Sequence, residues 1–477
     1  MPALGRDVLS VGIDVGTTTT SVVFSHLVLR DVARPGQVPR IQVDEKSIVH
    51  RGPVHPTPLT APDQIDAEGL AELVRTDYAG AGVTPDRIET GAVIVTGEAA
   101  RARNAEAILR ALSGQAGDFV VSVAGPNAEA QIAGRGAGVA RWSVDNYEQV
   151  TSVDIGGGTS NAAVFNLGRH VSSSAVAVGG RQVEVEPDGT VRRLPPPGRA
   201  IAAAAGVPLQ EGSVAPMEVL RRFCDVMADL VVDLAEGTRV DVPGVQLTPP
   251  LRDTERSTSV FLTGGVGACY YARPPVGTMA EVTAYGDVGP LLADCLHRNE
   301  RLRRHVVREP PETLAATVLG AAGQTVTLSG STIWTDRRLL PLTNLPVLRP
   351  ALPGRGGGPS FAEAVQDALE RWDLPADTAA AIVVDLPSGL GFGGLAEVAG
   401  EMAAYHDVAG PDRPLVLVME QDYAQVLGQT IQAARPGLPL VVLDQVGLGE
   451  GDYLDIGEPV LDGRAVPLSI KTLVFYD

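Results

Sequence analysis

The chain has 477 residues, and at roughly 100–200 residues per domain this length predicts two to four domains. Hydrophobic residues make up 44% of the chain and charged residues 20%, so the composition supports several apolar cores and excludes a disordered acidic protein. The formal net charge of −19 argues against binding to nucleic acid or to an anionic membrane surface, since both partners attract basic proteins.

The sequence also indicates where the protein resides. No apolar run reaches the roughly 18 residues of a membrane span, and the N-terminal segment lacks a signal-peptide pattern. The cysteines, Cys224, Cys269 and Cys295, are odd in number and lack metal-ligand spacing, which favours reduced thiols over a disulfide framework. We therefore expect a cytoplasmic protein. The sequence leaves open its oligomeric state and its association with a bacterial microcompartment.

The first chemical signal is a Gly/Thr turn between two β-branched segments, residues 8–14 and 19–27, which predicts a tight hairpin. A polyphosphate needs several N–H donors that converge on one point, and glycine lets the backbone come close. Such a turn can bind phosphate through Gly16, Thr17, Thr18 and Thr19. Asp14, at the end of the first strand, can hold Mg²⁺ or its waters. An ordinary Thr-rich hairpin is the alternative for this segment alone.

Predicted helices and strands follow, and then a second copy of this Gly/Thr pattern. The spacing of apolar residues predicts helices over 67–79, 98–112 and 126–133, and strands over 91–96 and 119–123. The segment SVDIGGGTSNAAVF (152–165) then repeats the order strand, Asp, Gly, Thr, strand. Three consecutive glycines are costly in chain entropy, but they suit close approach to an anion.

The second copy predicts its own ligands. Asp154 can position a metal-bound water or the attacking water, and can also bind the metal itself. The phosphate ligands expected here are Gly156, Gly157, Gly158, Thr159 and Ser160. Two such hairpins, one from each lobe, can hold one polyphosphate from opposite sides. A third segment, a strand at 260–263 followed by Gly264, Gly265 and Val266, can pass beneath a base and ribose; a simple turn is its alternative.

The last third of the chain has a different pattern. A Pro/Gly-rich stretch at 345–360 is typical of a linker. Beyond it, helices over 361–372, 392–405 and 422–434 alternate with strands over 380–385, 414–419 and 438–443. This alternation predicts a parallel sheet, and the C-terminal end predicts a β-hairpin.

The first Gly/Thr turn, its second copy at 152–165 and the strand at 260–263 with the glycines after it resemble three motifs of the actin-like ATPase superfamily. These are the phosphate-1, phosphate-2 and adenosine motifs, and the superfamily includes heat-shock chaperones and sugar kinases. The resemblance implies an α/β protein with two actin-like lobes, a nucleotide cleft between them and a C-terminal α/β unit. It implies ATP and Mg²⁺ as cofactors. The expected divisions are a first lobe at 1–138, a second at 139–324, return strands and linker at 325–360, and the C-terminal unit at 361–477.

Two connecting segments extend the resemblance. Residues 127–138 are similar to the first interlobe helix of that superfamily, and residues 317–324 to the second. A Glu near the start of the first helix positions the catalytic water in the superfamily, which implies that role for Glu129; a solvated carboxylate at a helix start is the alternative. The chaperones' catalytic lysine has no match, because Lys46 and Lys471 lie outside the motifs. Arg101 or Arg103 are candidate substitutes, with exposed helix residues as the favoured alternative. Without the lysine, we expect either slow hydrolysis or a site that mainly senses nucleotide.

A narrower resemblance covers nearly the whole chain. The segments VGIDVGTTTTSVVFS, IVTGEAARARNA, DIGGGTSNAAVF with AVGGR, and PLVLVMEQDYAQVLGQTI with GDYLDIGEP resemble the ethanolamine ammonia-lyase reactivating factors. That family uses ATP and Mg²⁺ to release damaged cobalamin from ethanolamine ammonia-lyase, so that adenosylcobalamin can bind. The resemblance implies this role and this partner. A small-molecule kinase, an actin-type filament protein and a scaffold that only binds nucleotide are the alternatives.

Overall fold

The computed structural model describes thirteen segments of the chain, and several predictions fall outside them. Among these are Thr17, Thr18, the helix predicted over 98–112 with Arg101 and Arg103, and residues 317–322 of the second interlobe helix. The described residues are 6–16, 19–31, 41–61, 64–88, 90–95, 118–123, 125–313, 323–328, 333–351, 359–386, 391–410, 413–457 and 466–472.

The first lobe is built on a mixed sheet with strand order β3-β2-β1-β7-β8. The first three strands run antiparallel as the chain turns back on itself, and β7 and β8 pair parallel beside β1. Helix α1 is capped at its start by Asp66, whose carboxylate accepts from the amides of Glu68 and Gly69. The elements are β1 (Arg6–Val15), β2 (Thr19–Asp31), β3 (Ile41–Arg51), β4 (His55–Pro56), β5 (Leu59–Ala61), β6 (Gln64–Ile65), α1 (Ala67–Ala81), β7 (Thr90–Val95) and β8 (Asp118–Val123).

The second lobe repeats this sheet. Its strand order is β11-β10-β9-β14-β15, again with three antiparallel strands followed by two parallel ones. The strands are β9 (Gln149–Ile155), β10 (Ser160–Asn166), β11 (Arg169–Val176), β12 (Glu184–Val185), β13 (Val191–Arg193), β14 (Ser259–Thr263) and β15 (Val306–Arg308). The helices are α3 (Pro126–Gly136), α4 (Val139–Asp145), α5 (Pro196–Ala205), α6 (Met217–Glu236), α7 (Gly264–Ala272), α8 (Met279–Val282) and α9 (Gly289–Arg298).

The C-terminal unit contains the three predicted parallel strands as β19, β20 and β21, which continue a parallel pairing with β18 in an eight-stranded sheet of order β16-β23-β22-β18-β19-β20-β21-β17. Its β16 and β18 come from residues that the sequence grouped with the linker, so the expected domain divisions stay a prediction. The elements are β16 (Gly323–Leu328), β17 (Trp334–Thr335), β18 (Leu342–Leu348), α11 (Phe361–Arg371), β19 (Ala381–Val383), α12 (Phe392–Ala409), β20 (Leu415–Val418), α13 (Ala424–Ala434), β21 (Leu440–Leu443), β22 (Asp452–Ile456) and β23 (Pro467–Thr472).

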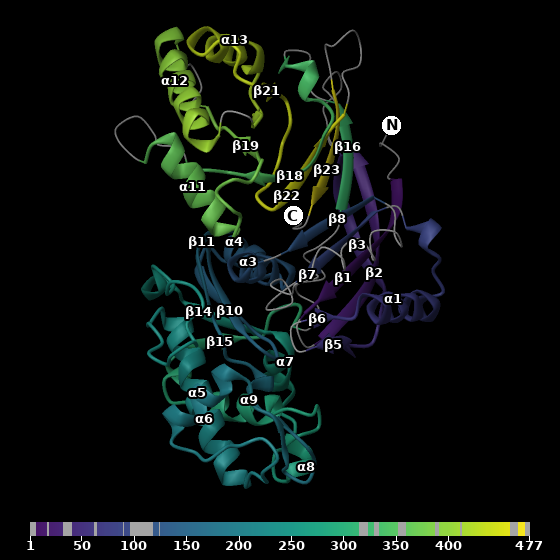
Figure 1. The fold of residues 1–477 in the computed structure, drawn as a ribbon, viewed down its shortest axis with the longest axis vertical. Helices are drawn as coiled ribbons and strands as arrows, with labels where there is room; N and C mark the ends of the chain where they lie inside the picture. Colours follow the sequence, from purple (N-terminus) through teal and green to yellow (C-terminus); the bar gives the residue numbers. More distant parts are fainter. Residues whose placement is uncertain are drawn as a thin grey trace.

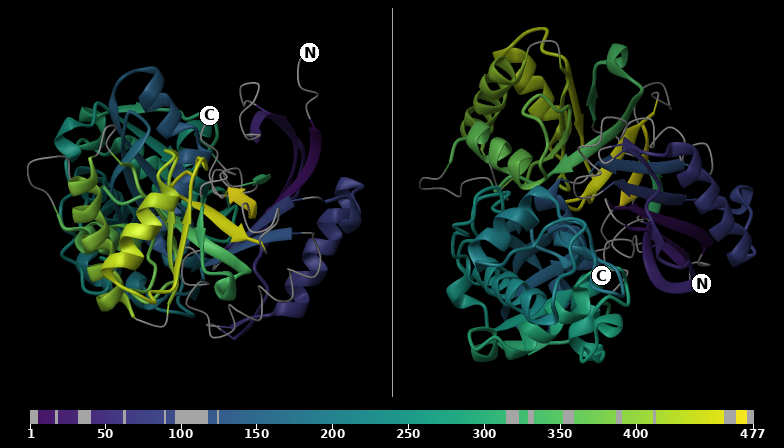
Figure 2. Two further views of the ribbon diagram at one scale, coloured as in Figure 1. Left: turned by 90° about the horizontal axis from the view of Figure 1, so that it is seen from above. Right: turned by 60° about the horizontal axis from the view of Figure 1, so that its bottom comes forward.

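Helix α3 occupies the junction between these parts (Figure 1). Ala130, Ala133 and Ala137 pack into an apolar cluster with strands of the second sheet. Ala128 and Ile132, on another side of the helix, belong to the core of the C-terminal unit. The right-hand view of Figure 2 shows the first lobe, the second lobe and the C-terminal unit as three regions, whereas in the left-hand view the C-terminal unit overlaps the second lobe. The predicted α/β class with two lobes and a C-terminal unit is therefore confirmed.

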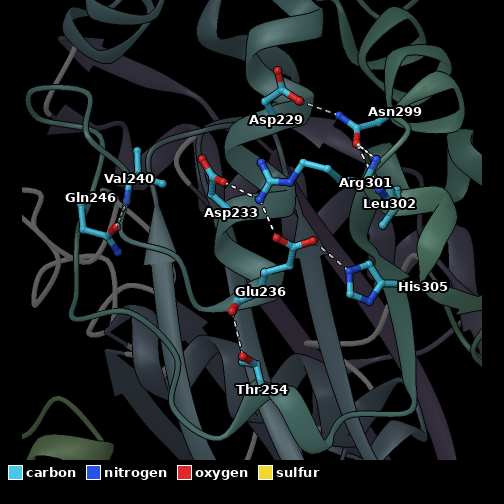
Figure 3. A network of polar contacts seen from close by, with 10 residues as sticks. All are labelled: Asp229, Asp233, Glu236, Val240, Gln246, Thr254, Asn299, Arg301, Leu302 and His305. Atoms are coloured by element: carbon cyan, nitrogen blue, oxygen red, sulfur yellow. Dashed lines mark hydrogen bonds and ion pairs between the residues drawn. The ribbon is translucent and has the colours of Figure 1, made fainter.

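A polar network stabilises the second lobe where α6 ends (Figure 3). The Arg301 guanidinium donates to Asp233 at 2.7 Å and to Glu236 at 2.6 Å, and the His305 ring lies 3.0 Å from Glu236. Burial raises the pKa of the Glu236 carboxyl, but Arg301 and His305 outweigh it, so this pKa lies below its ordinary value. Across the described residues, every helix is too short or too polar to cross a membrane.

Candidate functional site

The two Gly/Thr turns have the same backbone geometry. In the first, the Gly16 amide donates to the Thr19 carbonyl at 2.9 Å, and in the second the Gly156 amide donates to the Thr159 carbonyl at 3.0 Å. The strand registers also agree, since Val15 pairs with Thr20 as Ile155 pairs with Ser160. Asp14 and Asp154 therefore occupy equivalent positions, each one residue before the last paired residue of its strand.

The carbonyls of the three glycines in the second turn bond to one neighbouring segment. Gly156 accepts from the Gly180 amide at 3.1 Å, and Gly157 accepts from the Arg181 amide at 2.7 Å. The Gly158 carbonyl accepts from the Gln182 side chain at 2.6 Å. In a trans peptide the next N–H points away from its carbonyl. The amides of residues 157, 158 and 159 thus point away from segment 179–182, on one side of the turn, as an anion cradle requires.

Glycine is needed at Gly179 for this close fit. A Cβ there would lie 2.5 Å from the Gly157 carbonyl oxygen, so any side chain would displace the turn. In contrast, a Cβ at Gly158 meets nothing within 4 Å, so Gly158 borders open space.

Asp154 lies at the end of β9, beside the start of α7. The Thr263 hydroxyl donates to its carboxylate at 2.7 Å, which fixes the side chain. Burial raises the pKa of the Asp154 carboxyl, while the hydrogen bond from Thr263 acts in the opposite direction. The Asp154 side chain is half-buried, and a cation or a proton is the group that would complete the environment of its carboxylate.

The third predicted segment is a helix start and not a loop. Helix α7 begins at Gly264, whose φ of +79° and close approach to the Ile155 carbonyl, 2.5 Å from an added Cβ, both require glycine. The Gly264 amide donates to the Thr313 carbonyl at 2.8 Å. Gly265 faces open space, whereas the side chain of Val266 packs into the lobe's core. The structure thus brings Gly264 against the end of β9, next to the second turn, and turns Val266 inward.

The first turn is held by a residue that the sequence did not single out. The Thr57 hydroxyl donates to the Gly16 carbonyl at 2.7 Å and lies 3.0 Å from the Thr20 hydroxyl. Since Thr57 has one proton to give, Thr20 is the donor in the second contact. Asp14 is half-buried beside this turn. Thr57 lies in a proline-rich connection, where no local pattern distinguishes it from a surface threonine.

Glu129 is in the first turn of α3 and is buried, with 8% of its surface exposed. Its catalytic role stays a prediction. The body of α3 lies close to the second sheet, because a Cβ at Gly134 would come 2.4 Å from the Phe165 ring. Gly134 therefore allows close packing of this helix on the sheet.

Two duplicated α/β lobes that carry matching Gly/Thr turns define the actin-like ATPase class. Residues 6–476 match the family described as Ethanolamine utilisation protein EutA. The chain belongs to this family, as the narrower sequence resemblance predicted.

Two named relatives match nearly the whole chain. The chain is 39% identical to the ethanolamine ammonia-lyase reactivase EutA of Salmonella typhimurium and 38% identical to that of Escherichia coli, each over 98% of this chain and 99% of the relative. Among solved structures, MreB 5 of Spiroplasma citri bound to AMPPNP matches 65% of this chain and 94% of its own, with 14% identity and a TM-score of 0.32.

Proposed function

We propose that this protein is an ATP-dependent reactivating factor for ethanolamine ammonia-lyase, which releases damaged cobalamin so that adenosylcobalamin can rebind. The observation that carries the proposal is the second turn, where the peptide groups of residues 156–159 direct consecutive amides to one side. The family's curated relatives are named as reactivases of this lyase. We further propose a cytoplasmic location, in which the buried thiols of Cys224, Cys269 and Cys295 stay reduced, and association with a microcompartment is a separate question for localisation experiments.

The residues present fit ATP with Mg²⁺. The amide cradle supplies positive potential without lysine, and Gly158 leaves the approach to it open. Within the described segments, no group of three or more His, Cys, Asp or Glu side chains is gathered as a metal site. Mg²⁺ bound to nucleotide needs only one or two protein carboxylates, which here would be Asp14 and Asp154. When bound, the ion would neutralise phosphate charge and polarise the bond to be broken.

The chain's own residues would orient the phosphates and the water. Gly16, Thr19 and the second turn would orient the phosphates, with Gly264 and Gly265 near the nucleoside. Asp154, held by Thr263, would orient a water molecule on the phosphate side of β9. Glu129, buried in α3, would accept the hydrogen bond or proton of the attacking water.

Nucleotide binding between two lobes gives a means of acting on the lyase. A partner shifts an equilibrium only by its different affinity for the two states. We infer that the ATP-bound form favours an open lyase from which damaged cobalamin dissociates, and that hydrolysis lowers this affinity. No covalent step on cobalamin is part of this proposal.

The test is a reactivation assay. Ethanolamine ammonia-lyase inactivated with cyanocobalamin is mixed with this protein, Mg-ATP and adenosylcobalamin, and ethanolamine deamination is measured. Recovery should need ATP and should be lost in Asp14→Ala and Asp154→Ala. Asp145→Ala is the matched control, since it removes only a surface ion pair with Arg141. Absence of recovery by a wild-type protein that binds ATP would contradict the proposal.

A further inference from the structure

The start of helix α3 is capped by a residue from the C-terminal unit. The helix begins after Gly125 with Pro126, so its own sequence offers no side-chain cap. Asp373, just beyond α11, supplies one: its carboxylate accepts from the Asn127 amide at 2.7 Å and the Ala128 amide at 3.1 Å. It also accepts from the Asn127 side chain at 3.0 Å. A carboxylate at a helix N-terminus both satisfies these donors and matches the helix dipole.

This contact is closely fitted on both sides. A Cβ at Gly125 would lie 2.3 Å from the Cβ of Asp373, so only glycine allows the approach. Asp373 itself has a φ of +52°, a left-handed conformation that non-glycine residues seldom adopt. Such a conformation persists only where the surrounding contacts hold it.

Further contacts tie the same turn to its surroundings. The Gln131 side chain donates to the Arg371 carbonyl at 2.8 Å, and the Ser173 hydroxyl donates to the Asn127 side chain at 3.0 Å. The first turn of α3 is therefore fixed by the C-terminal unit on one side and by β11 on the other. Glu129 lies in this turn, and its amide donates to the Gly125 carbonyl at 2.9 Å.

We propose that Asp373 is a positioning residue for ATP hydrolysis, which sets the place of Glu129 through the first turn of α3. The inference rests on the proposed function, because it assumes that Glu129 acts on the attacking water. It adds a role for the C-terminal unit, because any partner that moves the segment after α11 would change the rate of hydrolysis.

The experiment measures ATP turnover and AMPPNP affinity of the full-length protein. Asp373→Ala removes the cap, and Gly125→Ala separates the same two residues without a change in charge. Each should lower kcat by about tenfold to a hundredfold and leave the AMPPNP Kd within about twofold, since loss of geometry affects the reaction more than binding. Asp377→Ala is the control, because it removes an exposed carboxylate four positions further along, whose nearest ion-pair partner is Arg413 at 3.9 Å.

A double-mutant cycle shows whether Asp373 acts through Glu129. In a Glu129→Gln background, Asp373→Ala should lower kcat by less than about twofold, because the group that it positions is already gone. An undiminished further loss in that background, or an unchanged kcat in the two single variants, would overturn the inference alone. A wild-type protein that binds ATP but never hydrolyses it would overturn the proposed hydrolysis and this inference together. Unchanged circular dichroism spectra in Gly125→Ala would exclude misfolding as the cause.

Discussion

The two Gly/Thr turns share their register and closing hydrogen bond but differ in what supports them. In the described part of the first turn, the Gly16 carbonyl accepts from Thr57, which reaches it from the loop after β4. The second turn is supported by segment 179–182 along its carbonyls and by Thr263 and Gly264 at its base. The described residues of the two turns are thus supported by different neighbours.

This difference suggests a division of labour. A turn whose carbonyls are bonded to a neighbouring segment is suited to the step that needs exact geometry, whereas a turn supported from the loop after β4 is suited to a lobe that moves as nucleotide binds. Substitutions in and around the two turns test this difference.

The largest effect is expected for the two equivalent aspartates. Asp154→Asn should lower kcat for ATP hydrolysis by about a hundredfold or more, because a carboxylate fixed beside the water is lost. Asp14→Asn, at the half-buried position in the first turn, should mainly raise KM for Mg-ATP, by about tenfold. Steady-state kinetics at several Mg²⁺ concentrations separates these outcomes. Equal effects of both variants on kcat would contradict the division of labour.

A pH effect is expected in the second lobe, in the strand that follows its hairpin. Burial lowers the pKa of His170 to about 3, and the nearby charges of Arg135, Arg371 and Arg252 act in the same direction. The unfolded chain takes up a proton near the ordinary pKa of about 6.5, whereas the folded protein does not until pH 3, so stability is lost as pH falls through this window. The free energy of unfolding should be about 2 kcal/mol lower at pH 5 than at pH 7.5 from this group.

Urea denaturation at the two pH values measures this effect. His170→Gln removes the titrating ring and should reduce the difference between pH 5 and pH 7.5 by most of that amount. If the variant and the wild-type protein lose the same stability over this range, His170 is not the cause.

Loss of the hydrogen bond from Thr57 to the first turn should have a smaller effect. Thr57→Val keeps the shape of the side chain but leaves the Gly16 carbonyl without its donor, which costs about 1–2 kcal/mol of stability. Mg-ATP affinity should fall by about tenfold because the turn is less ordered before binding. Thr60→Val, at an exposed position in the same connection, is the matched control. Calorimetric titration with AMPPNP gives both affinities, and an unchanged affinity in Thr57→Val would remove Thr57 from the site.

The smallest effect is expected where the lobes are joined by a surface ion pair. Arg51, at the end of β3, pairs with Glu312, just after the second sheet. Arg51→Ala should change stability by less than about 1 kcal/mol, since such pairs are screened by water and salt. Thermal unfolding at low and high salt measures it, and a loss several times larger would show that this pair holds the lobes together.

The hairpins could be predicted from the sequence because their signal is local. β-branched strands flank each Gly/Thr turn, so Asp14, Gly16, Asp154 and the three glycines lie where the pattern put them. The alternating pattern of the C-terminal unit was equally local, and its parallel strands follow it.

The residues that hold the site could not be predicted in this way. Thr57 reaches Gly16 from a proline-rich loop, and Asp373 reaches Asn127 across 246 positions of the chain. The Gln182 side chain reaches the Gly158 carbonyl, and this contact forms only when the chain is folded. The helix that starts at Gly264 contradicts the poor helix propensity of its glycines, because packing of Val266 into the core outweighs it. These contacts join residues that are separated in the chain, so no short sequence pattern marks them.

Binding of phosphate by the second turn is tested most directly by Gly158→Ala. An added Cβ at Gly158 meets no atom within 4 Å, so thermal stability should stay within about 0.5 kcal/mol of the wild-type value. Gly393→Ala, in α12, is the matched control, because its Cβ also meets nothing. By calorimetric titration with AMPPNP and Mg²⁺, Gly158→Ala should bind at least about tenfold more weakly, and Gly393→Ala as tightly as wild type. Equal affinity in all three proteins would contradict phosphate binding by the second turn.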